Sequence, residues 1–220
     1  MTKTLIDGQR AKEPRGAQII RVSLLSWPYA ENEVFMIIGV SGLNGSGKGA
    51  LLAELATRGY EILSLSDVVR DQLAKEGLDE TRERMIATGN ALRRAHGPGA
   101  LAHTLVSRLN AEASYGIDSI RHPAEVEALA AMSSDFRLIW VEAAAKIRLE
   151  RMQSRGRPGD PTTLSELDRL EGLERGGPDG STQQVDAIRD LADFVLTNEA
   201  GLEQLATALD AVLQGKSSRP

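Results

Sequence analysis

Apolar and polar positions alternate along the chain in blocks that predict strands and helices in turn. Residues 34–41 (VFMIIGVS) are almost continuously apolar, as in strands buried on both faces of a parallel sheet. Residues 49–59 (GALLAELATRG) have helical spacing and stop at a glycine. Further strands are expected at residues 60–66, 115–120, 136–143 and 192–198, with helical stretches between them. We therefore expect an α/β fold of three layers (α/β/α), with a central parallel five-stranded sheet.

The first part of the chain differs from this pattern. Residues 1–33 combine a polar, turn-rich stretch with a single strand-like run, and we expect a partly disordered N-terminal extension there. Residues 34–215 are expected to form one domain, because 220 residues with 41% hydrophobic content suit one large core.

Composition narrows the class of protein. The chain has no cysteine, which excludes disulfides, thiolate metal sites and cysteine nucleophiles, and its three scattered histidines do not favour a zinc site. A net charge of −5 does not favour a nucleic acid or an anionic membrane as partner. With no signal-like N-terminus and no membrane-length apolar run, we expect a cytoplasmic monomer or homodimer.

A phosphate-binding loop is predicted between the first strand and the first helix. The spacing Gly42-x-x-x-x-Gly47-Lys48 lets backbone N–H groups and a helix N-terminus surround phosphate oxygens. Lys48 would reach the outer phosphates of ATP. An ordinary glycine-rich turn is the alternative, and the full spacing in this context disfavours it. The expected ATP-binding residues of the loop are Gly42, Asn44, Gly45, Ser46, Gly47, Lys48, Gly49 and Ala50.

The loop lacks the hydroxyl that usually binds Mg²⁺. The usual loop has Ser or Thr directly after its lysine, or one residue later in the adenylate-kinase form, whereas this chain has Gly49 and Ala50. Mg²⁺ prefers water and phosphate oxygens. We therefore expect Mg²⁺ to be retained, with Asp118, at the end of a strand, as a ligand through water and Ser46 as a further indirect ligand.

Charged residues that follow the second and third strands are candidates for binding an acceptor. Asp67 and Arg70 lie three residues apart on a first helical turn, and Arg93 lies on a later helix. Arg121 would grip an acceptor phosphate, with Glu125 holding it by an ion pair. The alternatives are a capping role for Asp67, a solvated face for Arg70, and a purely structural Arg121–Glu125 pair.

A further group of arginines precedes a Gly-Pro-rich turn. Arg148, Arg151, Arg155 and Arg157 could neutralise charge that builds up during phosphoryl transfer, as a mobile lid does, or could simply form a solvated helix face. Asn198 ends the last strand, where its amide could read a purine edge or cap the next helix.

Together these segments resemble the dephospho-CoA-kinase-like and nucleoside-monophosphate-kinase-like branch of phosphate-loop kinases, including its poorly characterised bacterial and archaeal members and phage deoxynucleoside monophosphate kinases. The resemblance covers about residues 35–214, and "DSIRHPAEVEAL" resembles the family's Asp-Gly-Ile-Arg-x-x-x-Glu signature with Ser119 in place of Gly. Its other carriers are "GLNGSGKG", "SDVVRDQLAKEG", "GNALRRAHG", "RLERMQSRGRPGD" and "ADFVLTN".

The resemblance implies a fold and a site. It implies a P-loop NTPase domain with an acceptor-binding helical insert at about 67–113 and a helical lid at about 148–180. The loop would bind ATP, Asn198 would lie near the adenine, and the lid arginines Arg151, Arg155 and Arg157 would close over the phosphates. Asp67, Arg70, Arg93 and Arg121 would face the acceptor.

The predicted function is ATP- and Mg²⁺-dependent phosphoryl transfer to a small-molecule nucleotide, a (deoxy)nucleoside monophosphate. Lys48, Arg121, Arg151 and Arg155 would be catalytic. With a hydroxyl acceptor such as dephospho-CoA instead, Asp67 would be the base. The pattern also allows a nucleotide-binding regulator with little turnover and, more remotely, a kinase for a modified base within DNA.

Overall fold

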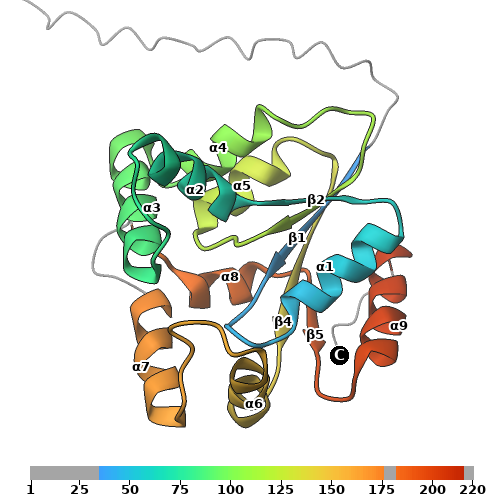
Figure 1. Ribbon diagram of the computed structural model, residues 1–220. Coiled ribbons are helices and arrows are strands. Elements are labelled where there is room, and N and C mark those ends of the chain that lie inside the picture. Colours follow the sequence, from blue (N-terminus) through green and yellow to red (C-terminus); the bar gives the residue numbers. More distant parts are fainter. Residues whose placement is uncertain (1–34, 176–181, 216–220) are drawn as a thin grey trace, which may run out of the picture. The chain divides into compact units, whose positions relative to one another are not determined.

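The structure is a computed structural model that describes residues 35–175 and 182–215 (Figure 1). The predicted N-terminal extension, residues 1–33, and residues 176–180 of the predicted lid lie outside the described residues.

The described strands form one parallel sheet in the order β2-β3-β1-β4-β5. The predicted five-stranded parallel sheet is thus confirmed, and β1 lies at its centre. The strands are β1 Met36–Ser41, β2 Glu61–Ser64, β3 Tyr115–Asp118, β4 Asp135–Glu142 and β5 Phe194–Thr197.

Helices cover both faces of the sheet, which explains the continuous apolar runs. Ile37 packs with one core cluster and Ile38 with the other, and both side chains are fully buried. Because neighbouring strand residues point to opposite faces, both must be apolar. The first cluster joins the sheet to α2 Leu65–Lys75, α4 Ala100–Val106, α5 Pro123–Ala130 and α8 Val185–Leu191, and the second joins it to α1 Lys48–Thr57 and α9 Leu202–Leu213.

The remaining described helices lie near the C-terminal ends of the strands (Figure 1). They are α3 Arg82–His96, α6 Ala145–Arg155 and α7 Leu164–Arg175. The break that "HGPGA" predicts separates α3 from α4. No helix within the described ranges combines the length and apolar character needed to cross a membrane.

The start of α2 differs from the prediction. The helix begins at Leu65, two residues before Asp67, because the Ser64 hydroxyl accepts a hydrogen bond from the Ser66 N–H at 3.2 Å and acts as the N-cap. The capping role considered for Asp67 is therefore wrong, and β2 is shorter than expected.

Candidate functional site

The phosphate loop connects β1 to α1 and depends on its glycines. Gly42 has a φ of 143° and Gly47 a φ of 106°, which side-chain-bearing residues rarely adopt. A Cβ atom at Gly42 would lie 2.2 Å from the Val141 carbonyl oxygen, and one at Gly47 would lie 1.9 Å from Asn198 Nδ2. The spacing Gly-x-x-x-x-Gly is therefore required by the close approach of β4 and of the residue after β5.

The loop leaves a helix N-terminus open for an anion. Gly47 caps α1 without a side-chain hydrogen bond, so the first N–H groups of the helix have no side-chain acceptor at this cap. The Lys48 ammonium donates to the carbonyl oxygens of Gly42 at 2.8 Å and Leu43 at 3.1 Å. Lys48 is thus folded over the loop, where phosphate oxygens would be close to it.

Gly49 and Ala50 occupy different environments. Gly49 is exposed, and a Cβ atom built on it meets no other atom within 4 Å. Ala50 packs against the core cluster that α1 and α9 share. A hydroxyl side chain would therefore face outward from position 49, whereas position 50 points towards the core.

Two buried oxygens are the candidates for contact with the water shell of a bound Mg²⁺. The hydroxyl of Ser46 and Oδ1 of Asp118 are buried and have no hydrogen-bond partner among the described residues. Asp118 Oδ2 accepts a hydrogen bond from Ser119 Oγ at 3.2 Å, and Ser64 Oγ donates to Ser119 Oγ at 3.1 Å. A carboxylate oxygen that is held in place and unpaired is a suitable acceptor for water bound to a hard cation.

Ser119 itself has an unusual backbone. It is the single non-glycine residue with positive φ in the described chain, at 65°. Such strain costs about 1–2 kcal/mol. Ser119 is the position that is Gly in the Asp-Gly-Ile-Arg-x-x-x-Glu signature which this segment resembles. The turn at Ser119 lies directly after β3 and separates Asp118 from Arg121.

Helix α6 packs against the loop through buried arginine contacts. Arg148 is 5% exposed, pairs with Glu171, and donates to the carbonyl oxygens of Ala143 at 3.0 Å and Asn44 at 3.2 Å. The alternative of a solvated helix face is therefore wrong for Arg148. Its charge is compensated by Glu171, and it supports the loop.

Arg151 and Asn198 also contact the loop. Arg151 donates to the carbonyl oxygens of Ser46 at 3.2 Å and Asn198 at 2.9 Å. The Asn198 amide donates to the same Ser46 carbonyl at 2.9 Å. Asn198 does not cap the next helix, because the N-cap of α9 is Gly201.

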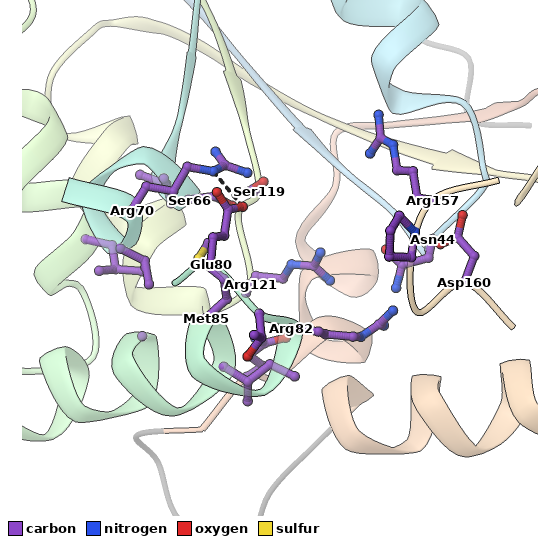
Figure 2. A pocket seen from close by; sticks show the side chains of 18 of the residues that line it. Asn44, Ser66, Arg70, Glu80, Arg82, Met85, Ser119, Arg121, Arg157 and Asp160 are labelled. Atoms are coloured by element: carbon purple, nitrogen blue, oxygen red, sulfur yellow. Dashed lines mark hydrogen bonds and ion pairs between the residues drawn. The ribbon is translucent and has the colours of Figure 1, made fainter. Parts of the chain in front are cut away.

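The turn after α6 carries two further predicted arginines. Arg155 binds both carboxylate oxygens of Asp160, at 2.7 and 2.8 Å. This pair raises the pKa of Arg155 and lowers the pKa of Asp160 through the shared hydrogen bonds. Arg157 is exposed, and Figure 2 shows it on the same side of the view as Asn44 of the loop.

A cavity of about 360 Å³ opens beside the loop. Figure 2 shows Arg70, Glu80 and Arg121 on one side of it and Asn44, Arg157 and Asp160 on the other. Its charged lining residues are Arg70, Arg82, Arg93, Arg121, Arg155, Arg157, Glu80 and Asp160. Arginine guanidinium groups dominate this lining, which suits an anionic ligand.

Arg70 lines this cavity and Asp67 does not. Arg70 donates to Asp67 at 2.7 Å and to Glu80 at 2.9 Å. Burial lowers the pKa of Arg70, but the hydrogen bonds that its guanidinium donates to Glu80 and Asp67 outweigh this effect and leave the pKa raised. Of the two residues predicted to bind an acceptor, Arg70 lines the cavity, whereas Asp67 pairs with Arg70 and does not line it.

The predicted partner of Glu125 is different. Glu125 Oε1 accepts from the Arg93 guanidinium at 2.9 and 2.7 Å, and both side chains are almost fully buried. Its Oε2 accepts from the main-chain N–H groups of Arg121 at 2.8 Å and His122 at 3.1 Å. Glu125 therefore neutralises Arg93 and fixes the main chain of Arg121, instead of pairing with the Arg121 side chain.

Several lining residues have no signal in the sequence pattern. Glu80, Arg82 and Gln183 all line the cavity. Gln183 lies directly before the N-cap of α8, and no local pattern distinguishes it. Glu80 directly precedes the turn into α3. Its place in the cavity lining depends on the packing of α2 against α3, which the sequence does not show.

The chain is similar in sequence to a known domain family and to archaeal relatives. Residues 36–175 match the sequence profile of a family described as an AAA domain. A "UPF0200 protein" of Halobacterium salinarum is 36% identical over 183 residues, which cover 80% of this chain and 92% of that protein. A "UPF0200 protein" of Aeropyrum pernix is 33% identical over 172 residues, which cover 77% of this chain and 88% of that protein.

The fold is also similar to that of solved kinases. The structure of shikimate kinase from Acinetobacter baumannii in complex with shikimate matches with a TM-score of 0.52 at 16% identity, covering 85% of this chain and 97% of that one. At this identity the likeness concerns the fold alone. The phosphate loop, the sheet order and the sequence matches together show that this chain belongs to the UPF0200 proteins and carries an AAA domain of the phosphate-loop type.

Proposed function

We propose that this protein transfers the terminal phosphoryl group of ATP to a (deoxy)nucleoside monophosphate. The observation that carries the proposal is the position of Asn44. This residue belongs to the phosphate loop and also lines the arginine-rich cavity, so donor and acceptor phosphates would meet at one edge of the sheet. In an open parallel sheet, ligands bind at the carboxyl ends of the strands.

The residues present can supply the interactions that phosphoryl transfer needs. An oxygen of the acceptor phosphate would attack the terminal phosphorus of ATP, the bond from that phosphorus to the bridging oxygen would break, and ADP would leave with the bonding electrons. An acceptor phosphate is already an anion, so no base is required. Lys48, Arg121 and Arg157 would neutralise charge on the oxygens.

The support for the loop would act as positioning. Arg151 and Asn198 hold the Ser46 carbonyl, and Arg148 holds that of Asn44, so the loop N–H groups are oriented before ATP arrives. Bound Mg²⁺ would supply charge neutralisation on the outer phosphates, with Asp118 and Ser46 as the nearby oxygens.

A hydroxyl acceptor, as in dephospho-CoA kinases, is the second candidate. It would require Asp67 as the base, but Asp67 pairs with Arg70 and is absent from the cavity lining. This arrangement favours a phosphate acceptor. The other alternative is a nucleotide-binding regulator with little turnover. Its one supporting observation is the missing hydroxyl in the phosphate loop.

An acceptor screen tests the proposal. ADP release is measured with ATP and Mg²⁺ across the common ribo- and deoxynucleoside monophosphates, dephospho-CoA and shikimate. We expect release that depends on a monophosphate and that Lys48→Ala lowers at least about 100-fold, the scale of a removed electrostatic contact in a transition state. ATP binding without acceptor-dependent ADP release would instead support the regulator.

A further inference from the structure

Gln183 is held in a defined place beside the acceptor cavity. It lies in the short stretch before α8 and lines the cavity. The next residue, Gln184, donates its main-chain N–H to the Arg121 carbonyl oxygen at 2.8 Å. Val185, the first residue of α8, is fully buried in the core. The stretch is therefore tied to the end of β3 on one side and to the core on the other.

The side-chain oxygen of Gln183 has no partner within the described part of the chain. Oε1 is buried and accepts no hydrogen bond there, although folded proteins pair nearly all buried polar atoms. Among the described residues, the other such oxygens are Ser46 Oγ and Asp118 Oδ1, and neither of those residues lines the cavity. Gln183 thus combines a place in the lining of the cavity with a side-chain oxygen that no described residue uses as a hydrogen-bond acceptor.

The charged acceptors in the same lining are already engaged. Glu80 is bound by Arg70 at 2.9 Å, and Asp160 is bound by Arg155 at 2.7 and 2.8 Å. A carboxamide does not ionise, so Gln183 Oε1 can accept from a neutral N–H without forming an ion pair with the surrounding guanidinium groups.

An apolar surface lies in the same cavity. Val69 on α2 and Met85, Ile86 and Gly89 on α3 line it. A flat ring could pack on these side chains while its edge reaches a polar group. A nucleobase has this combination of apolar faces and N–H groups at the edge.

We propose that Gln183 selects the acceptor by accepting a hydrogen bond from an exocyclic amino group of its base. The inference rests on the proposed function, because it takes the acceptor to be a nucleoside monophosphate. The arginines would bind the phosphate, the α2–α3 surface would take the ring, and Gln183 would distinguish amino-bearing bases from others.

The test uses pairs of acceptors that differ in one amino group. The pairs are AMP and purine riboside 5′-monophosphate, GMP and inosine 5′-monophosphate, and CMP and the 5′-monophosphate of 2-pyrimidinone riboside. We expect the full chain to prefer the amino-bearing member of its best pair about tenfold in kcat/KM, which is the effect of about one hydrogen bond. Gln183→Met should remove this preference by raising the KM of the amino-bearing member, with the KM for ATP unchanged.

Gln184→Met is the matched control. Gln184 is the adjacent glutamine, its side chain makes no cap hydrogen bond, and it does not line the cavity. This variant should keep the preference of the parent chain. A Gln183→Met variant that keeps the preference, or a parent chain that prefers an acceptor without an amino group, would overturn the inference.

Direct binding separates this inference from the proposed function. AMP, GMP and CMP binding is measured by calorimetry in the presence of a non-hydrolysable ATP analogue. If the parent chain binds one of them and Gln183→Met weakens that binding about tenfold, but no ADP is released, the role of Gln183 stands and the kinase activity is refuted. If none binds, both proposals fail.

Discussion

At the scale of single residues, the site depends on where each side chain points, which the sequence motif does not specify. Gly49 and Ala50 are adjacent, yet one faces open space and the other the core. In the same way, Asp67 and Ser66 are neighbours, and only Ser66 lines the acceptor cavity. Roles read from a motif must therefore be checked against the direction of the side chain.

Restoring the missing hydroxyl should act at position 49 alone. We expect Gly49→Ser to lower the Mg²⁺ concentration needed for half-maximal turnover several-fold, because it restores a hydroxyl directly after Lys48 at a position where the side chain has free space. Ala50→Ser is the control: it places a hydroxyl against the core, should destabilise the fold by about 1 kcal/mol, and should leave the Mg²⁺ requirement unchanged. The turnover of both variants is measured as a function of Mg²⁺ concentration. An equal change in the Mg²⁺ requirement of the two variants would contradict the prediction.

At the scale of elements, ion pairs between segments keep the site in place. Arg93 and Glu125 join α3 to the start of α5, Arg148 and Glu171 join α6 to α7, and Arg155 and Asp160 close the turn after α6. Each pair has a carboxylate whose partner the sequence pattern does not indicate. Arg93 and Glu125 are 32 residues apart in the sequence, so no local pattern can indicate that they are in contact.

Removing one partner of the buried pair should destabilise the fold strongly. Arg93→Met leaves the Glu125 carboxylate buried without its cation, and we expect a loss of about 3 kcal/mol in the free energy of unfolding. Glu80→Gln, which weakens the exposed pair with Arg70, should cost less than about 1 kcal/mol. Urea unfolding measures both, and similar losses for the two variants would contradict the difference in burial.

Acidification should loosen the turn after α6. The pKa of Asp160 is lowered by its hydrogen bonds from Arg155, so the folded state favours the ionised carboxylate. The stabilisation is present above the ordinary aspartate pKa of about 3.9 and is lost as the pH falls through the lower folded value. Carbon-13 NMR of the carboxyl groups should place the Asp160 titration below the ordinary value, and Arg155→Met should raise it. If the pKa of Asp160 is unchanged in the Arg155→Met variant, the hydrogen bonds from Arg155 do not lower it.

At the scale of the whole molecule, the parallel sheet brings residues that are distant in the chain to one edge. Loop residues after β1, Arg121 after β3, the arginines after β4 and Asn198 after β5 all follow the carboxyl ends of strands. This order is what makes a site for two phosphates possible in one domain.

ATP should therefore stabilise the molecule as a whole. At a free ATP concentration of about 100 times its Kd, the gain is about 2.7 kcal/mol and appears as a raised unfolding temperature. Lys48→Ala should remove most of this shift, whereas Lys75→Ala, at the far end of α2, should keep it. Thermal unfolding with and without ATP provides the measurement, and equal shifts in both variants would exclude the phosphate loop as the binding site.

The strands, their parallel arrangement and the phosphate loop could be predicted from the amino-acid sequence. These follow from local physics: an apolar run such as residues 36–41 must be buried on both faces, and glycines at 42 and 47 allow backbone angles that other residues rarely adopt. Only the packing of the elements shows that Arg93 pairs with Glu125, that Asp67 is absent from the cavity lining, and that Gln183 lines the cavity and has a side-chain oxygen left unpaired by the described residues. Such partners depend on how separate elements pack, and the spacing of residues along the chain does not show which residues of different elements are in contact.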